Sequence, residues 1–349
     1  MKANRTNRRF KGLVLVTIIA VYLVILAGGI VRATGSGMGC PDWPKCFGNW
    51  VPPTSVDQLP PDYQERYAQV RVQKNQKLAG YLELFGLTGL AQQIQQEAIA
   101  APEAAFNKLK TWTEYINRLL GVILGLLISA MTFYSVTFRK NHPALFYGSV
   151  AALLLVIFQG WIGSVVVSTN LLPGIISFHM LMAILLIGLL VYIYFINIQI
   201  MNVHTIKLHK PATVRMILLL SMGFFLLQIV IGTQVREAVD VAMLNVGQSA
   251  RDQIISQLGA AYYFHRTFSL LLLGMTGYLF VLLKRSGNRE VRLLADLMLL
   301  LVSVEVILGI TMAYAGIPPW AQPLHLLVAL LIMGLQFWIF LQTKITSNA

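Results

Sequence analysis

Apolar residues are grouped into long uninterrupted runs along this chain of 349 residues. A helix needs about 20 mostly apolar residues to cross the hydrocarbon core of a bilayer. The runs are too long for barrel strands and lack their two-residue alternation, so we predict an all-α integral membrane protein. The predicted transmembrane helices cover, approximately, residues 12–32, 114–138, 145–168, 175–200, 213–235, 261–283, 292–315 and 322–343.

Composition supports this class, because 56% of the residues are hydrophobic and only 12% are charged. Soluble domains carry about 25% charged residues. These values exclude a cytosolic globular enzyme, a disordered protein and a disulfide-stapled secreted domain. The net charge of +13 could suggest nucleic acid. However, the basic residues lie in short loops between apolar runs, as membrane topology requires, so we expect lipid contact and no nucleic-acid partner.

The distribution of Lys and Arg predicts the orientation in the membrane. Basic residues of the short loops fall on one side, which we interpret as the cytoplasm, together with both termini. The N-terminal run is too long for a signal peptide and has no obvious cleavage site, so we expect a retained first helix. The long loop at 33–112 then lies outside, and residues 60–110 resemble amphipathic surface helices. Because no transit peptide is evident, we favour a bacterial inner membrane.

Four motifs recur in the same order in both halves of the chain. Two pairs are offset by 146 residues, one pair by 148 and one by 204, the larger offset reflecting extra sequence in the first outer loop. The repeat predicts two tandem four-helix bundles, residues 1–205 and 206–349, related by an axis along the membrane normal. The paired motifs are His179 with His325, Gln159-x-x-x-Gly163 with Glu305-x-x-x-Gly309, Asn117-Arg118 with His265-Arg266, and Gly28-x-x-x-Arg32 with Gly232-x-x-x-Arg236.

Three of the six histidines lie inside the outer ends of apolar helices, where an ionisable side chain is costly and marks function. His265 and His325 begin two helices of the C-terminal half at the same depth. Two facing histidines suit the axial positions of a haem iron, whereas zinc requires further ligands. The third is His179. The other histidines belong to or flank basic loops, and we interpret them as solvated: His142, His204 and His209.

The N-terminal half repeats this plan with one change. His179 corresponds to His325, but Asn117 stands where His265 would be. Asparagine is a poor iron ligand, so one histidine and an open face are expected there, as in a site that performs chemistry. Glu114 lies one helical turn before Asn117 on the same face and could take or relay protons. The alternative is an interfacial acid that faces water.

Four arginines occur as symmetric pairs near outer helix ends: Arg32, Arg118, Arg236 and Arg266. Guanidinium groups pair well with carboxylates, so they could bind haem propionates, and the alternative is contact with lipid headgroups. We favour propionates for Arg118 and Arg266. No partner is evident for Glu305, which lies in the middle of a helix.

Two cysteines, Cys40 and Cys46, follow the first helix in a segment rich in glycine and proline. Five intervening residues allow a small disulfide loop, and the outer compartment lets such a bond persist. The disulfide could brace the loop. It could also pass electrons or hold a reaction intermediate.

Residues 28–46 (GGIVRATGSGMGCPDWPKC) resemble the first-loop signature of the haem A synthase family. The Glu114 segment, His179, His265-Arg266 and His325 follow in that family's order, over essentially all eight helices. The resemblance implies an oxidoreductase that oxidises the C8 methyl group of haem O to a formyl group, giving haem A for terminal oxidases. It also implies a haem b cofactor on His265 and His325, with substrate haem and the acid Glu114 in the N-terminal bundle.

Asn117 departs from this family's pattern, which has a second histidine there. His179 is then the sole expected protein ligand of the substrate iron. The alternative is a membrane b-type cytochrome or haem carrier without haem O oxidation. A membrane thiol–disulfide protein would leave the histidines unexplained, and a transporter has no evident site at the middle of the membrane. A haem farnesyltransferase would need clustered aspartates, and the predicted helices contain only Asp296. A haem O synthase, an oxidase assembly partner or a second copy of the chain are compatible partners.

Overall fold

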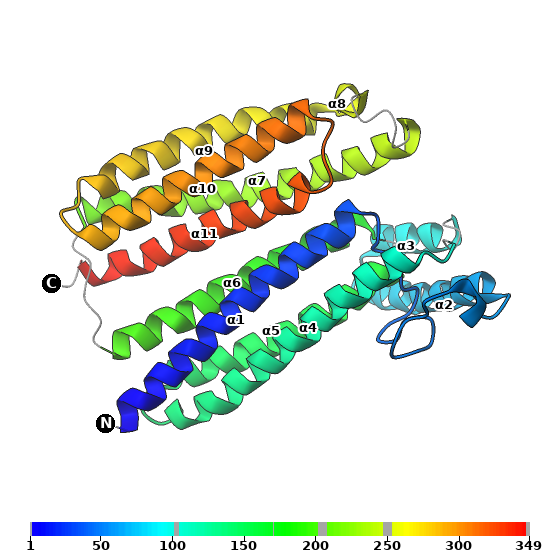
Figure 1. The fold of residues 1–349 in the computed structure, drawn as a ribbon, viewed down its shortest axis with the longest axis horizontal. Coiled ribbons are helices and arrows are strands. Elements are labelled where there is room, and N and C mark those ends of the chain that lie inside the picture. Colours follow the sequence, from blue (N-terminus) through cyan, green and yellow to red (C-terminus); the bar gives the residue numbers. More distant parts are fainter. Residues whose placement is uncertain (1, 101–104, 170, 202–207, 247–252, 347–349) are drawn as a thin grey trace.

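Eight long apolar helices form the body of the protein in a computed structural model that describes residues 2–100, 105–169, 171–201, 208–246 and 253–346 (Figure 1). Each is long and apolar enough to cross a membrane. The described residues form no strand. The predicted all-α membrane fold with eight spans is therefore confirmed. The helices are α1 (Lys2–Ala33), α4 (Lys108–Ser135), α5 (Pro143–Ser168), α6 (Pro173–Ile200), α7 (Pro211–Val246), α9 (Ala260–Lys284), α10 (Arg289–Tyr314) and α11 (Ala321–Thr346).

Local sequence signals define several helix ends. Proline begins α5 and α7, where the missing N–H is one that a first helical turn leaves unpaired anyway. The side chain of Asn107 accepts a hydrogen bond from the Lys110 backbone N–H at 3.1 Å and caps α4. Asn288 caps α10 in the same way through the Glu290 N–H at 2.8 Å.

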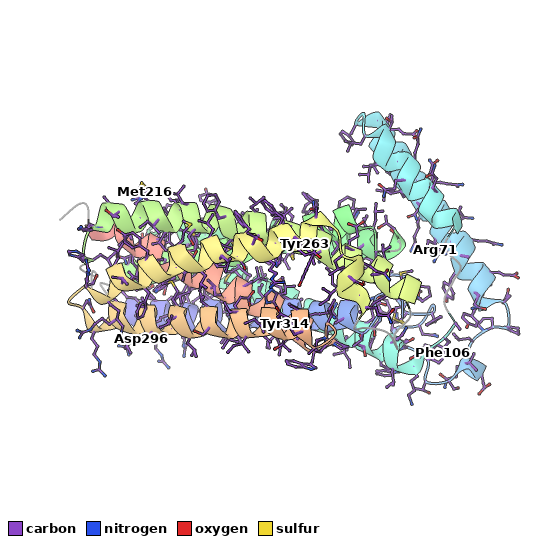
Figure 2. All side chains as sticks on the ribbon, turned by 90° about the horizontal axis from the view of Figure 1, so that it is seen from above. Arg71, Phe106, Met216, Tyr263, Asp296 and Tyr314 are labelled. Carbon is purple, nitrogen blue, oxygen red and sulfur yellow. A yellow bond between two sulfur atoms is a disulfide. The ribbon has the colours of Figure 1, made fainter. Side chains whose placement is uncertain are left out.

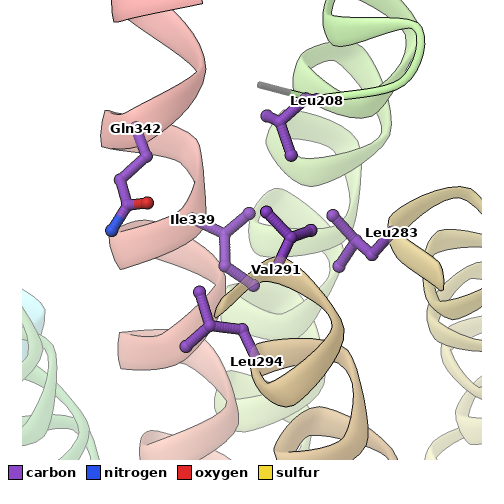
Figure 3. A pocket seen from close by; sticks show the side chains of 6 residues that line it. All are labelled: Leu208, Leu283, Val291, Leu294, Ile339 and Gln342. Atoms are coloured by element: carbon purple, nitrogen blue, oxygen red, sulfur yellow. The ribbon is translucent and has the colours of Figure 1, made fainter. Parts of the chain in front are cut away.

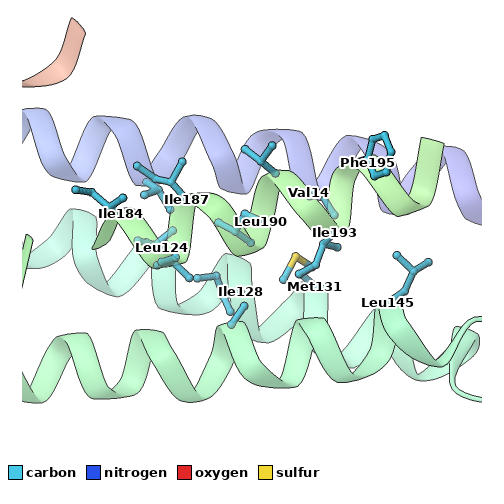
Figure 4. Packing of buried hydrophobic residues seen from close by; sticks show 14 of the residues in the cluster. Val14, Leu124, Ile128, Met131, Leu145, Ile184, Ile187, Leu190, Ile193 and Phe195 are labelled. Atoms are coloured by element: carbon cyan, nitrogen blue, oxygen red, sulfur yellow. The ribbon is translucent and has the colours of Figure 1, made fainter. Parts of the chain in front are cut away.

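The long helices pack in two groups of four. Helix α1 contacts α4 and α6, and α5 contacts the same two helices. Likewise, α7 and α10 each contact α9 and α11. The groups meet through α1, α6, α7 and α11 (Figure 1). The largest core lies in the first group, and Figure 4 shows side chains that fill it: Val14, Leu124, Ile128, Met131, Leu145, Leu190 and Ile193.

Small residues let the two groups approach closely. A Cβ atom at Gly29 of α1 would lie 2.9 Å from the Cβ of Pro323 in α11, closer than real Cβ contacts allow. Between α6 and α7, the Ser177 hydroxyl donates to the Thr233 hydroxyl at 2.8 Å. Backbone approach through glycine is a common way to pack membrane helices.

Helix α7 extends well beyond its predicted end at residue 235. The predicted span stops before the charged residues Arg236 and Glu237, but the helix continues through them, and Arg236 forms an i,i+4 ion pair with Asp240 at 2.8 Å inside it. Val239 and Ala242 are also buried, in a cluster with residues of the short helix α8 (Ile254–Gln257). Packing thus continues the helix past its apolar run.

The long first loop contains a helical hairpin, α2 (Tyr63–Leu84) and α3 (Thr88–Ala100), so the prediction of helices within 60–110 is confirmed for these two segments. Figure 2 shows the hairpin projecting to the side of the helical body. Its attachment includes the Asn75 side chain, which donates to the Ser168 carbonyl at the end of α5 at 2.7 Å. The tip carries exposed apolar side chains at Leu84 and Phe85.

Candidate functional site

His265 on α9 and His325 on α11 face each other. Their ring centres are 6.4 Å apart, with the ring planes inclined by 66°. A metal–nitrogen bond of about 2 Å on each side, plus about 1 Å from each nitrogen to its ring centre, would separate the centres by about 6 Å. The Nδ1 atoms of both rings are buried without a hydrogen-bond partner. The pair therefore fits two axial ligands of one iron.

A glycine on a neighbouring helix makes room for each ring. A Cβ atom at Gly232 of α7 would lie 3.2 Å from Cε1 of His265, and one at Gly309 of α10 would lie 3.6 Å from Cε1 of His325. Larger side chains at these positions would press against the imidazoles. The need for space beside each imidazole ring therefore explains why glycine recurs at these positions.

A polar residue precedes each of these glycines by four positions. The Gln228 amide donates to the backbone carbonyl of His265 at 2.9 Å. Oε1 of Glu305 lies 3.1 Å from Nδ1 of His325, which supplies the partner that sequence did not reveal. Our sequence interpretation omits Gln228, although the spacing Gln228-x-x-x-Gly232 repeats the same motif.

The N-terminal group has the same local arrangement. A Cβ atom at Gly163 of α5 would lie 3.7 Å from Cε1 of His179 on α6, and the Gln159 amide donates to the His179 carbonyl at 3.2 Å. On α4, Oδ1 of Asn117 is the atom nearest to a Cβ placed at Gly28 of α1, at 3.9 Å. Asn117 thus faces a glycine as the three histidines do, and its buried Oδ1 has no hydrogen-bond partner.

The cysteine loop packs on the outer end of α4. Cys40 and Cys46 form a disulfide, as expected, and both are fully buried. The Cys40 N–H donates to Oε2 of Glu114 at 2.9 Å, and the Thr111 hydroxyl donates to the Gly39 carbonyl at 2.8 Å. Glu114 is only 3% exposed, so the alternative of a water-facing acid is wrong.

Arg118 holds the same loop from one turn further along α4. Its guanidinium donates to the backbone carbonyls of Asp42 at 2.6 Å, Lys45 at 2.9 Å and Cys40 at 3.0 Å. It also forms an ion pair with Glu114. These contacts account for Arg118 without a propionate, and they give Glu114 a structural role beside its predicted chemical one.

The other three arginines lie in two places. Arg32 of α1 and Arg236 of α7 share the carboxylate of Asp240, at 3.3 and 2.8 Å, so one acid joins the two helix groups. Arg266 is exposed, and its guanidinium donates to the Tyr314 hydroxyl at 3.3 Å. Asp240 is absent from our sequence interpretation because its charge alone gave no reason to single it out.

The remaining histidines lie away from these clusters. His142 precedes α5, and His209 is exposed, with its backbone N–H donating to the Ser286 hydroxyl at 2.9 Å. His204 lies outside the described residues. Across the described part of the chain, no three residues of the types His, Cys, Asp and Glu come together as a metal site.

An apolar pocket lies about four helical turns from His325 along α11, near Ile339 and Gln342 (Figure 3). Its lining leaves too little space for a water molecule. It is therefore not a candidate for a large ligand. The remaining lining residues are Leu208, Leu283, Val291 and Leu294.

Together, these features define a multi-pass membrane protein with a facing histidine pair in its second half and a disulfide loop over its first. The family comparison agrees with this class. The chain belongs to the COX15-CtaA family of cytochrome oxidase assembly proteins, whose sequence profile matches residues 11–83 and 88–337.

Several curated relatives are named heme A synthase. The protein from Shewanella oneidensis is 29% identical over 51% of this chain and 43% of its own length. That from Rickettsia africae is 30% identical over 51% of this chain and 47% of its own length. The chain thus matches less than half the length of these two relatives. The Pelagibacter ubique protein is 23% identical over 91% of this chain and 92% of its own length.

Proposed function

We propose that this chain is a haem A synthase, an oxidoreductase that converts the C8 methyl group of haem O, its substrate, into a formyl group. Family membership and the names of the relatives support the activity. The observation that carries the proposal is the histidine pair, His265 and His325, whose ring centres lie 6.4 Å apart. A membrane b-type cytochrome is the second candidate, and the loss of one ligand position at Asn117 favours it.

In this proposal His265 and His325 hold a haem b cofactor. The glycines that face both rings support such a ligand pair. Bound haem b would supply one-electron transfer. Arg266 is the arginine that we assign to a propionate, because it follows His265 directly and its side chain is exposed at this end of α9.

The two helix groups correspond to residues 1–205 and 206–349 as repeated bundles in this proposal. Equivalent residues make equivalent contacts across the junction, which supports the repeat. Gly29 of α1 meets Pro323 of α11, and their repeat counterparts, Thr233 of α7 and Ser177 of α6, meet each other. An axis along the membrane normal would relate the two contacts.

The N-terminal bundle receives haem O, with His179 as the protein ligand of the substrate iron. Asn117 leaves the opposite position open. We assign proton transfer to Glu114, which lies on the same helix as Asn117 and is buried against the cysteine loop. Its bonds to the Cys40 N–H and to Arg118 fix the carboxylate in place for this role. Arg32 and Arg236 join the two bundles through their shared ion pairs with Asp240.

Both termini lie in the cytoplasm of a bacterial cell in this proposal, and the cysteine loop lies outside. The basic residues of the short loops support that orientation. Partners fitting the activity are an enzyme that supplies haem O and an oxidase assembly factor that receives haem A.

The test is co-expression with a haem O synthase, followed by extraction and chromatography of the haems and a pyridine haemochrome spectrum of the purified protein. Haem A in the extract, together with one low-spin haem b per chain, is the expected result. Haem b without haem A would identify the b-type cytochrome instead. Replacing His265 or His325 by Ala should abolish the low-spin spectrum. Glu114→Gln should keep that spectrum and stop haem A formation.

A further inference from the structure

Glu305 stands in the middle of α10, where a charged residue is costly and needs a reason. The two corresponding positions, Gln159 and Gln228, hold amides that donate to the backbone carbonyl of the neighbouring histidine. The Glu305 side chain makes no such bond, because its Oε2 has no hydrogen-bond partner and its Oε1 lies beside the ring of His325. A glutamate at this one position therefore serves another purpose.

The partner of Glu305 is the ring of His325 itself. Oε1 lies 3.1 Å from Nδ1, although the two are not well aligned for a hydrogen bond. The Glu305 side chain is 17% exposed, and its Oε2 is buried without a hydrogen-bond partner. Among the ion pairs of the described residues, Glu305 takes part in this one alone.

We propose that Glu305 is a positioning residue that holds the Nδ1 proton of His325 and lowers the reduction potential of the haem bound between His265 and His325. This inference rests on the proposed function. A histidine that ligates a metal through one nitrogen usually donates the other N–H, and a carboxylate acceptor raises the basicity of the ligand. The added electron density and negative charge stabilise the oxidised iron.

The same geometry makes the two axial ligands unequal. His265 has no carboxylate at the corresponding place, because residue 228 is an amide that donates to the His265 backbone carbonyl. Gln228 and Glu305 thus stand at the same spacing before the glycines that face the two rings, with side chains of the same length and different chemistry. Because Glu305 has an oxygen where Gln228 has an NH₂ group, the basicity is raised for the ring of His325 and not for that of His265.

The experiment is an optical redox titration of purified protein in nanodiscs. Glu305→Gln keeps the size and removes the charge, so we expect the midpoint potential of the low-spin haem to rise. Gln228→Ala is the matched control, since it removes a polar contact to the other ligand without changing charge, and a smaller shift is expected. An unchanged potential in Glu305→Gln, or an equal shift in Gln228→Ala, overturns the inference.

A second variant covers the case in which Glu305→Gln loses its haem. Glu305→Asp keeps the charge and shortens the side chain. Haem retained in Glu305→Asp shows that the carboxylate is required and supports the inference, whereas haem lost in both shows that only size matters and overturns it. Failure of the proposed function is recognised separately. If the low-spin spectrum survives in both His265→Ala and His325→Ala, these two histidines are not the haem ligands.

Discussion

Replacing Arg118 with Met should open the cysteine loop. The guanidinium makes three hydrogen bonds to backbone carbonyls of the loop and an ion pair with Glu114. Methionine keeps most of the length of the side chain and removes every one of these contacts. The loop would then depend on the bonds from the Cys40 N–H to Glu114 and from Thr111 to Gly39.

The size of the effect follows from burial. The side chains of Arg118 and Glu114 are only 13% and 4% exposed, so Arg118→Met strands a carboxylate away from water. Removing one partner of a buried ion pair costs about 3–5 kcal/mol. Water that enters as the loop opens recovers part of this cost, so we take about 3 kcal/mol. That value corresponds to about a 100-fold shift of the opening equilibrium, at 1.4 kcal/mol for each factor of ten.

Reduction of the disulfide reports this opening, because Cys40 and Cys46 are fully buried in the closed loop. Purified protein is treated with dithiothreitol, quenched with a maleimide over time and weighed by mass spectrometry. The reduction rate should rise by about 100-fold where opening is fast and reversible. Arg266→Met, at the exposed counterpart in the second half, should leave the rate unchanged. A parental rate in Arg118→Met would refute the argument.

Three further substitutions test the close approaches in the structure. Gly39→Ala places a Cβ 2.6 Å from backbone atoms of α4 and should destabilise the loop by about 1–3 kcal/mol, seen as faster disulfide reduction. In the control, Gly80→Ala, the added Cβ meets nothing within 4 Å. This variant should increase the free energy of unfolding by about 0.5–1 kcal/mol, measured as a higher unfolding midpoint. Gly232→Val should lower haem per chain in a pyridine haemochrome assay, whereas Gly223→Val on the same helix should not. Asn117→His should add a second low-spin haem signal to the electron paramagnetic resonance spectrum, and its absence would contradict the equivalence of that position.

The spans could be predicted from sequence because the length of an apolar run is a direct physical requirement of the bilayer. The predicted 145–168 and 261–283 differ from α5 and α9 by at most two residues at each end. The largest differences lie at the start of α1, which begins at Lys2 against a predicted 12, and at the end of α7, where Arg236 and Glu237 interrupt the apolar run. Helical propensity, an i,i+4 ion pair and contact with α8 continue the helix there, and none of these is visible in a hydropathy pattern.

The candidate site could also be predicted from sequence only in part. The repeat identified His179, His265 and His325 because a motif that recurs in order at a fixed offset needs no three-dimensional knowledge. The bond between Cys40 and Glu114 joins residues 74 positions apart and depends on how the loop folds back onto α4. The partner of Glu305 is hidden for the same reason, since it lies on a different helix.

The difference between the two halves lies in their side chains, because the local framework is shared. All four candidate positions face a glycine on a neighbouring helix, so each has room for an imidazole. Three hold histidine, and the fourth holds Asn117. The helix that carries Asn117 also carries Glu114 and Arg118, which anchor the disulfide loop. In the proposed function, the open iron position and the cysteine loop therefore belong to one side of the protein, and the saturated histidine pair belongs to the other. A closed electron-transfer site beside an open reaction site is the division of labour that oxidation of a haem substituent requires, since a fully ligated iron leaves no coordination position for chemistry.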